Sequence, residues 1–229
     1  MSPTQLPLLI PATQDYQEAG FLTARTNEAA RSWLDRTELW PERRLALWGD
    51  GAHGKTHLLR IWTEHHDAEW RDGATLIGFP YIEAPGGIAI DNADRADEAA
   101  LLHLLNTAHD LNRPVLLAAR PAPARWPVTL PDLASRLRAI TAVEIEPPGD
   151  ALLRGLLLRW LAQRRLVLDE ALHQRLLIHL PRRAEVLRAA VARLDRDALI
   201  SRRRTVSPAM LRAALAAAGD SPPTRRSDP

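Results

Sequence analysis

The sequence predicts an α/β protein in which a parallel sheet covered by helices is followed by a smaller all-helical domain. Three observations lead to this prediction. Up to residue 147, short apolar runs alternate with segments of helical spacing, which is typical of a parallel sheet with helices on its faces. Pro147-Pro148-Gly149 interrupts the alternation, and the longer segments after it all have helical spacing. A glycine-rich loop also lies between the first apolar run and a helical segment, as in phosphate-binding folds.

The elements follow from these patterns in chain order. Residues 1–14 carry three prolines and few periodic positions, which indicates an extended tail, and Asn27 can N-cap a helix running to about Arg36. The predicted strands lie near residues 44–48, 74–78, 87–91, 114–119 and 141–145. The predicted helices of the sheet domain cover about 54–66, 97–112 and 131–138, and those of the helical domain about 150–165, 169–180, 183–199 and 207–218. We therefore expect four regions: a tail at 1–14, a sheet domain at 15–147, a helical domain at 148–218 and a disordered tail at 219–229.

Composition excludes several classes of protein. The 229 residues include no cysteine, so disulfide scaffolds, thiolate zinc sites and thiol nucleophiles are excluded. The N-terminal residues lack the basic start and long apolar run of a signal peptide, and no apolar stretch approaches the length of a membrane span. We expect a cytoplasmic protein with no membrane partner.

Charge is unevenly distributed along the chain. Residues 1–150 hold 14 basic and 21 acidic side chains, whereas residues 151–229 hold 16 basic and 7 acidic ones. The basic half would suit a polyanion or an acidic partner surface, and solvated arginines on helices are the simpler alternative. Lys55 is the single lysine among 30 basic residues, which indicates a position that requires a compact ammonium.

That lysine lies in a complete G-x-x-x-x-G-K-[ST] motif. The motif comprises Gly49, Asp50, Gly51, Ala52, His53, Gly54, Lys55 and Thr56. Its glycines let backbone N–H groups converge on phosphates, its lysine reaches the outer phosphates, and its threonine hydroxyl ligates Mg²⁺. The strand before it and the helix after it provide the context that the motif requires, so we predict a nucleotide phosphate site here.

A strand further along the chain supplies the acidic partner of this site. Ile88-Ala89-Ile90 leads into Asp91, which we expect to hold Mg²⁺, although a strand-ending aspartate can also simply cap a turn. In many nucleotide hydrolases the next residue is acidic and activates water, but here it is Asn92, whose amide cannot accept a proton. Asp94 is an alternative base two residues further on. Slow hydrolysis by the chain alone is expected.

An arginine after the fourth core strand is a candidate for action on a second chain. A parallel P-loop sheet with a helical appendage is the AAA+ layout, in which an arginine of one subunit reaches the nucleotide of the next. Arg136 lies in the segment from Leu130 to Leu137 on a short predicted helix. A guanidinium there could stabilise charge on the γ-phosphate, or it could form an ordinary surface ion pair.

These features resemble a known family. The phosphate loop followed by His57-Leu58-Leu59, the strand that ends in Asp91-Asn92 and the segment from Leu130 to Leu137 resemble the DnaA-related AAA+ proteins. Within them, the resemblance is closest to the Hda type, the regulatory inactivators of the replication initiator DnaA, and it covers about residues 5–217. It implies an AAA+ core with a helical lid and no DnaA-type DNA-binding domain, so DNA contact is a possibility but not the leading expectation.

The resemblance also implies roles for individual residues. It implies nucleotide contacts from Gly49 to Thr56, a metal partner at Asp91, and an arginine finger at Arg136 that is presented to ATP on DnaA. Asn92 is itself typical of the Hda type. The aspartate that follows the fourth strand in DnaA has no counterpart in Ala118-Ala119-Arg120.

The nucleotide-sensing arginine of the DnaA lid is a second departure. In the resemblance its position falls, without gaps, near Glu185 of this sequence, so Arg182 or Arg183 would have to take the role.

The N-terminal tail resembles the short clamp-binding peptide of the Hda type. A glutamine with apolar anchors on an extended segment can dock in a hydrophobic pocket, and the alternative is a tail that packs on its own domain. The anchors are Gln5, Leu6, Leu8 and Ile10.

The function that we expect is therefore a regulatory AAA+ adaptor. It would bind ADP or ATP with Mg²⁺, dock on the DNA polymerase sliding clamp and stimulate ATP hydrolysis by DnaA, with little ATPase activity of its own. A homo-oligomer is compatible with the layout. The alternatives are a self-sufficient P-loop ATPase or nucleotide kinase, which would turn over alone, and a nucleotide-gated helicase-loading factor, which would not need a clamp-binding peptide.

Overall fold

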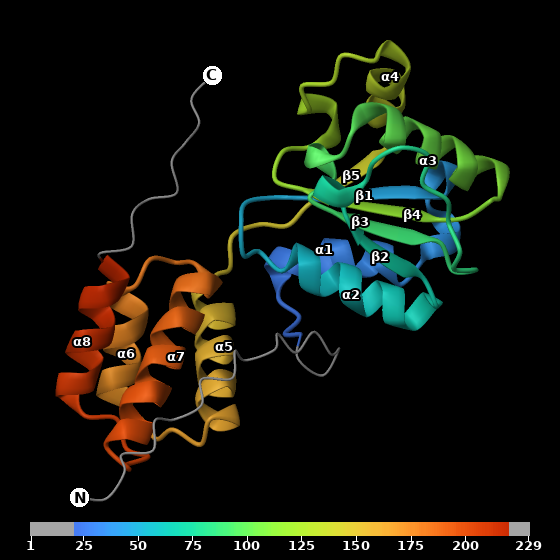
Figure 1. Ribbon diagram of the computed structural model, residues 1–229. Coiled ribbons are helices and arrows are strands. Elements are labelled where there is room, and N and C mark those ends of the chain that lie inside the picture. Colours follow the sequence, from blue (N-terminus) through green and yellow to red (C-terminus); the bar gives the residue numbers. More distant parts are fainter. Residues whose placement is uncertain (1–20, 220–229) are drawn as a thin grey trace, which may run out of the picture.

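The computed structural model describes residues 21–219 and contains a five-stranded sheet and a separate bundle of four helices (Figure 1). The sheet part comprises α1 (Arg25–Leu34), β1 (Arg44–Trp48), α2 (Lys55–His66), β2 (Glu69–Asp72), β3 (Ile88–Asp91), α3 (Glu98–Asp110), β4 (Val115–Ala119), α4 (Pro131–Ala139) and β5 (Thr141–Glu144). The helical part comprises α5 (Asp150–Gln163), α6 (Glu170–His179), α7 (Ala184–Ile200) and α8 (Pro208–Gly219).

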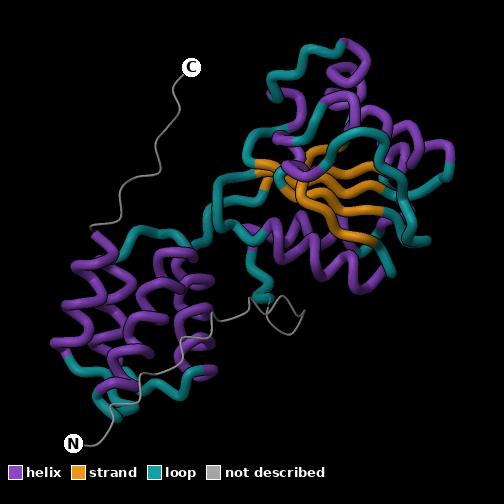
Figure 2. Tube along the Cα trace, in the orientation of Figure 1, coloured by secondary structure: helices purple, strands orange, loops and turns teal. Residues whose placement is uncertain are grey.

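The sheet is entirely parallel, with strand order β2-β3-β4-β1-β5. All its strands lie in one part of the molecule, and the other part is helical (Figure 2). Strand β1 therefore lies between β4 and β5. After β1 the strands β2, β3 and β4 are placed on one side of it, and β5 is added on the other side. Ligands of such folds bind beyond the carboxyl end of the strands at this switch of direction. The glycine-rich loop leaves β1 at that point.

The alternating side chains of the strands divide the sheet part into two cores. Leu45 and Leu47 face the layer that contains α1 and α2, where Leu58 and Trp62 are fully buried. Ala46 faces the opposite layer, which is formed by α3 and α4. Because both faces are covered, the central strands are mostly apolar, and this is why they were recognisable in the sequence.

The helical part has its own apolar core. Each helix contributes, with Leu157 of α5, Leu176 of α6, Leu194 of α7 and Leu211 of α8 almost completely buried. The helical spacing of these leucines predicted the four helices, and the structure places them within about two residues of the expected ends.

One predicted strand is wrong. The strand next to β3 is β2 at Glu69–Asp72, whereas residues 74–78 form part of a short 3₁₀ turn and a loop. The sequence Glu-Trp-Arg-Asp has no apolar run because β2 is an edge strand with half-buried side chains. The apolar signal came from Leu76, which is buried in the core from a loop.

The predicted cap of the first helix also needs correction. The helix begins at Arg25, and Asn27 lies within its first turn instead of before it. Its side chain accepts a hydrogen bond from the Ala24 N–H at 2.9 Å and donates one to Leu22 O at 3.0 Å. Asn27 therefore caps the helix from inside and fixes the chain that enters it.

Candidate functional site

The loop after β1 is held open by two glycines in conformations that favour glycine. Gly49 has φ +143°, and a Cβ added to it would lie 2.5 Å from Ile145 O. Its N–H donates to Arg120 O at 3.1 Å, and His53 Nδ1 lies 2.9 Å from Ile145 O. Gly54, with φ +96°, is the N-cap of α2. The loop is thus anchored to the ends of β4 and β5 and leads directly into the N-terminus of α2, which favours anions.

Lys55 lies at the floor of this loop. It is only 8% exposed, and Nζ donates to Gly49 O at 2.6 Å and to Asp50 O at 2.8 Å. Burial lowers the pKa of the ammonium, the carboxylate of Asp91 opposes that shift, and the nearby Arg120 guanidinium adds to it. An ammonium is compact enough to fit inside the loop and can donate to both carbonyls, with a third N–H left for a ligand, whereas a planar guanidinium is larger. This accounts for the single lysine of the chain.

Thr56 and Asp91 meet beside the lysine. Thr56 Oγ1 donates to Asp91 Oδ2 at 2.6 Å, and Asp91, at the end of β3, is 6% exposed. A hydroxyl and a carboxylate at this separation are the oxygen ligands that Mg²⁺ uses in phosphate sites, so these two residues fit the ion. Within residues 21–219, no three His, Cys, Asp or Glu side chains gather as a metal site of their own.

Asn92 is directed away from that pair. Its backbone N–H donates to Asp91 Oδ1 at 3.0 Å, while its side-chain Nδ2 donates to Asp72 Oδ2 at 3.2 Å. Asn92 also has a left-handed backbone with φ +50°, a conformation that Asn and Asp tolerate better than most residues. The amide thus links β3 to the edge strand β2 and is not a base for water activation.

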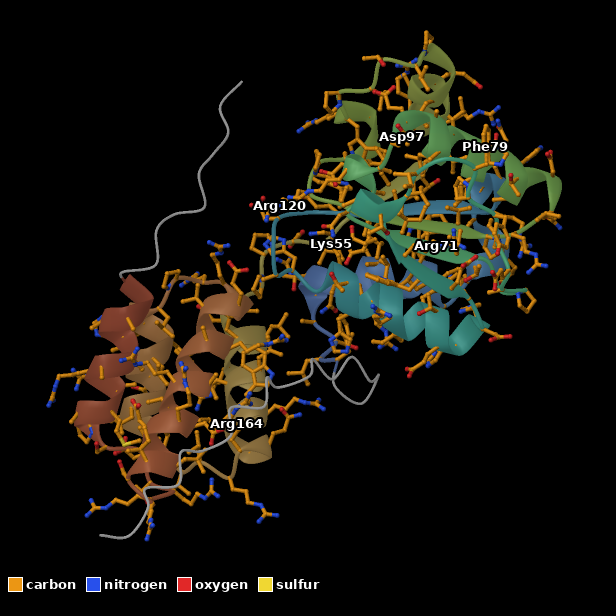
Figure 3. The ribbon with its side chains drawn as sticks, in the orientation of Figure 1. Lys55, Arg71, Phe79, Asp97, Arg120 and Arg164 are labelled. Atoms are coloured by element: carbon orange, nitrogen blue, oxygen red, sulfur yellow. The ribbon has the colours of Figure 1, made fainter. Side chains whose placement is uncertain are left out.

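Arg120 is a residue that the sequence analysis did not assign to the site. It follows β4 directly, and a Cβ added to Gly51 would lie 3.6 Å from its guanidinium Nη2. Figure 3 shows Arg120 and Lys55 on the side of the sheet part that faces the helical part. The sequence could have identified Arg120 as a site residue, because the carboxyl ends of parallel strands lie at one edge of the sheet and Arg120 is the first residue after such an end. The loop is therefore flanked by a second cation.

A cavity of about 520 Å³ adjoins the loop and extends to the helical part. Its polar wall contains Ala52, His53, Gly54, Lys55 and Thr56. Its other walls come from the residues before α1 and from α5 and α7, namely Phe21, Leu22, Leu152, Leu156, Trp160, Glu185, Arg188, Ala189 and Ala192. Such a volume suits a ligand of drug or nucleotide size, with phosphates on the polar side and an aromatic base on the apolar one.

Arg188 and Trp160 form the helical side of this cavity. The Arg188 guanidinium carbon lies 5.2 Å from the centroid of the Trp160 ring, which is cation–π geometry. Trp160 was predicted only as a core residue of α5, and it is both 8% exposed and part of the cavity wall. Arg188 lies one turn after Glu185 on the same face of α7, so helical spacing could have placed it beside Glu185 in the sequence analysis.

The two arginines expected to sense a nucleotide lie just before α7 and pair with carboxylates. Arg182 pairs with Asp150 at 3.3 Å, and Arg183 pairs with Glu185, both at the start of α7. Neither residue lines the cavity. Their role in nucleotide sensing stays a prediction.

Arg136 is also separate from the chain's own cavity. It lies on α4, which covers the face of the sheet opposite α2 (Figure 1). Its Nε contacts Asp132 Oδ1 at 3.2 Å, one helical turn away, and the side chain is 30% exposed. Such a surface ion pair contributes less than about 1 kcal/mol, so it would not prevent the guanidinium from engaging another ligand.

The remaining predicted site lies outside the described residues, since Gln5, Leu6, Leu8 and Ile10 belong to residues 1–20. No helix within residues 21–219 combines the length and apolarity needed to cross a membrane.

Comparisons with known proteins place this geometry in a fold. No family model matches the chain, and no curated protein matches it. Domain III of the replication initiation protein DnaA from Thermotoga maritima superimposes with a TM-score of 0.77 at 17% identity, covering 91% of this chain and 98% of that one. The chain has a DnaA-like AAA+ fold.

Other solved structures agree. AMPPCP-bound DnaA from Aquifex aeolicus gives a TM-score of 0.65 at 16% identity, with 79% of this chain and 65% of that chain covered. The Thermotoga maritima RuvB Holliday junction branch migration motor gives 0.64 at 14% identity, with 84% and 67% covered. The chain thus spans about two thirds of the longer DnaA structures. The AAA+ fold predicted from the sequence is confirmed, and the narrower assignment to the Hda type stays a prediction.

Proposed function

We propose that the chain is a regulatory AAA+ adaptor that holds an adenine nucleotide and acts on the ATPase site of DnaA. The nucleotide would occupy the cavity between the two parts, with its phosphates at the loop around Lys55. Thr56 and Asp91 would hold Mg²⁺, which supplies charge neutralisation at the phosphates. Support comes from the cavity that joins Lys55 and Thr56 to an apolar wall, from the buried ammonium, and from the hydrogen bond between Thr56 and Asp91. One of the structural neighbours is DnaA with AMPPCP bound.

The observation that carries the proposal is the direction of Asn92. The residue that follows the metal-binding aspartate donates its amide to Asp72, so it neither accepts a proton nor faces the Thr56–Asp91 pair. A site with complete phosphate-binding parts and an amide in place of the carboxylate after Asp91 suits retention of a nucleotide better than its turnover.

Action on a second chain would come from Arg136. It is partly exposed on α4, and its own Asp132 partner binds it weakly. Because the chain shares the fold of DnaA domain III, it can pack against DnaA in the way that AAA+ subunits pack against one another. An arginine finger presented to ATP in this way contributes about 10³–10⁵ in rate where such fingers have been measured.

The sliding clamp is the second proposed partner. Residues Gln5, Leu6, Leu8 and Ile10 would dock on it, and clamp loaded on DNA would bring the adaptor to DnaA. The product of the reaction would be ADP-bound DnaA, which limits initiation.

The test uses purified DnaA, clamp loaded on DNA and the full chain. Arg136→Ala should fold, bind ADP and bind clamp as the wild type does, yet remove stimulation of ATP hydrolysis by DnaA. Arg138→Ala is the matched control, because Arg138 is exposed on the same helix two residues away. Persistent stimulation by Arg136→Ala refutes the finger, and loss in both variants refutes its specificity. Deletion of residues 1–12 should abolish clamp binding and leave ADP binding intact.

A further inference from the structure

The end of the helical part that points away from the sheet is built from two loops that lie side by side. One joins α5 to α6, and the other joins α7 to α8 (Figure 1). Val167 N–H donates to Arg204 O at 2.8 Å, and Val206 N–H donates to Val167 O at 2.9 Å, so the two loops form one surface. Figure 3 shows Arg164 at this end of the bundle.

Five arginines gather on these loops, and two of them have structural partners. Arg164 Nη1 donates to Trp160 O at 3.3 Å, and its Nε lies 3.8 Å from the carboxylate of Asp195. Arg204 Nη1 donates to Arg164 O at 3.4 Å. These contacts satisfy carbonyl groups at the C-terminus of α5, where cations are favourable.

The other three arginines serve no such purpose. Arg165, Arg202 and Arg203 are exposed, and their side chains make no hydrogen bond or ion pair with any residue between 21 and 219. Arg165 and Arg202 also have left-handed backbones, with φ +54° and +51°, at helix ends where glycine or asparagine is usual. The C-terminal ends of α5 and α7 favour cations, but no carbonyl or carboxylate within residues 21–219 holds these three guanidinium groups. We call Arg165, Arg202 and Arg203 the basic end.

We propose that the basic end binds the phosphate backbone of duplex DNA. A guanidinium presents a planar fork that matches phosphate oxygens. A duplex carries about one charge per 1.7 Å of its axis, twice the density of a single strand, so a compact cluster of cations meets the most phosphates on a duplex. No base-specific contact is implied.

The charge of the whole chain would orient the complex. Residues 1–150 carry an acidic excess, while residues 151–229 carry a basic one. A polyanion would attract the helical part and repel the sheet part, so that the nucleotide cavity and α4 stay turned away from DNA and accessible to a protein partner.

An acidic protein surface is the competing occupant, because aliphatic side chains border the basic end. Val167, Leu199 and Ile200 are 58%, 50% and 75% exposed. A protein partner would bury such groups at the interface centre, whereas a phosphate backbone contact would not depend on them. Ile200→Ser therefore separates the two.

The experiment measures binding of the full chain to a fluorescein-labelled 30-bp duplex by anisotropy at several salt concentrations. The triple variant Arg165→Ser/Arg202→Ser/Arg203→Ser should bind about tenfold or more weakly. Its plot of log affinity against log salt should be shallower by about 2.7, because each phosphate that an arginine neutralises adds about 0.9 to the slope. Arg36→Ser/Arg125→Ser/Arg175→Ser removes the same charge from exposed positions elsewhere and should change affinity less than about twofold.

Each outcome decides the proposal. Unchanged duplex affinity in the first triple variant, equal losses in both triple variants, or no wild-type binding at low salt overturns it, and so does a comparable loss in Ile200→Ser. ADP binding by all variants is measured alongside as a check on folding. Because Arg165, Arg202 and Arg203 do not line the cavity, ADP affinity should not change in the triple variant. Failure of the proposed nucleotide site would appear separately, as loss of ADP binding by the wild type.

Discussion

The sheet part and the helical part contribute to the same cavity in different ways. On the sheet side, Lys55 and Thr56 are held by short hydrogen bonds to Gly49 O and to Asp91. On the helical side, the wall is mostly aliphatic and aromatic, with Arg188 over Trp160. The sheet part is thus built for phosphate and the helical part for a flat apolar group. A ligand that contacts both should hold them in one arrangement and stabilise the chain by mass action.

Loss of Lys55 should have the largest effect on ligand binding, because it removes the charge on which the sheet side of the cavity depends. We expect Lys55→Ala to weaken ADP binding about 100-fold, the equivalent of about 3 kcal/mol in charge-assisted hydrogen bonds. Isothermal titration calorimetry measures the ADP affinity of each variant. Lys55→Arg keeps the charge but not the compact geometry, and it should lose most of the same affinity. Wild-type affinity in Lys55→Arg would contradict our explanation of the single lysine.

Loss of the helical contribution should have a smaller effect. Arg188→Ala should weaken ADP binding about fivefold to tenfold, because it removes the cation–π contact with Trp160, worth about 1 kcal/mol, that supports the helical wall of the cavity. Arg182→Ala is the matched control on the adjoining segment, since Arg182 pairs with Asp150 outside the cavity. A loss in Arg182→Ala or Arg183→Ala with none in Arg188→Ala would instead favour the assignment made from the sequence.

The link between Asn92 and Asp72 can be tested without any ligand. Asn92→Asp tolerates the left-handed backbone but places a carboxylate against that of Asp72, so the free energy of unfolding should fall by about 1 kcal/mol. The double exchange Asp72→Asn/Asn92→Asp should recover most of that loss in urea unfolding experiments. Additive effects would mean that the hydrogen bond does not couple the two strands. Asn92→Asp should not produce appreciable ATPase activity, because the side chain faces β2.

The lowered pKa of Lys55 predicts the smallest effect, a dependence on pH. Burial disfavours the ammonium, so Lys55 should lose its proton at a lower pH than an ordinary lysine, and ADP affinity should decline as pH rises through that lowered pKa. Between the folded and unfolded pKa values the unfolded chain binds more protons, so the stability of the ligand-free chain should rise with pH. Calorimetry and urea unfolding between about pH 7 and 10 should therefore show opposite trends. Parallel trends would refute the assignment.

Local patterns predicted most of the fold but less of the site. The central strands and the motif from Gly49 to Thr56 were recognisable because their residues are contiguous and their burial is periodic. The edge strand β2 was missed because half-exposed side chains carry no apolar signal. The positions of Arg120 and Arg188 depend on how distant segments pack, and so does the direction of Asn92 toward Asp72.

The central claim is that the chain retains a nucleotide without cleaving it and supplies Arg136 to another chain's reaction. Release of labelled phosphate from ATP measures it most directly, with the wild type alone, with DnaA and DNA-loaded clamp, and with Arg136→Ala in the same mixture. We expect almost no release by the wild type alone, strong release in the complete mixture and none above the DnaA background with Arg136→Ala. Brisk hydrolysis by the chain alone, or equal release with Arg136→Ala, would contradict the account.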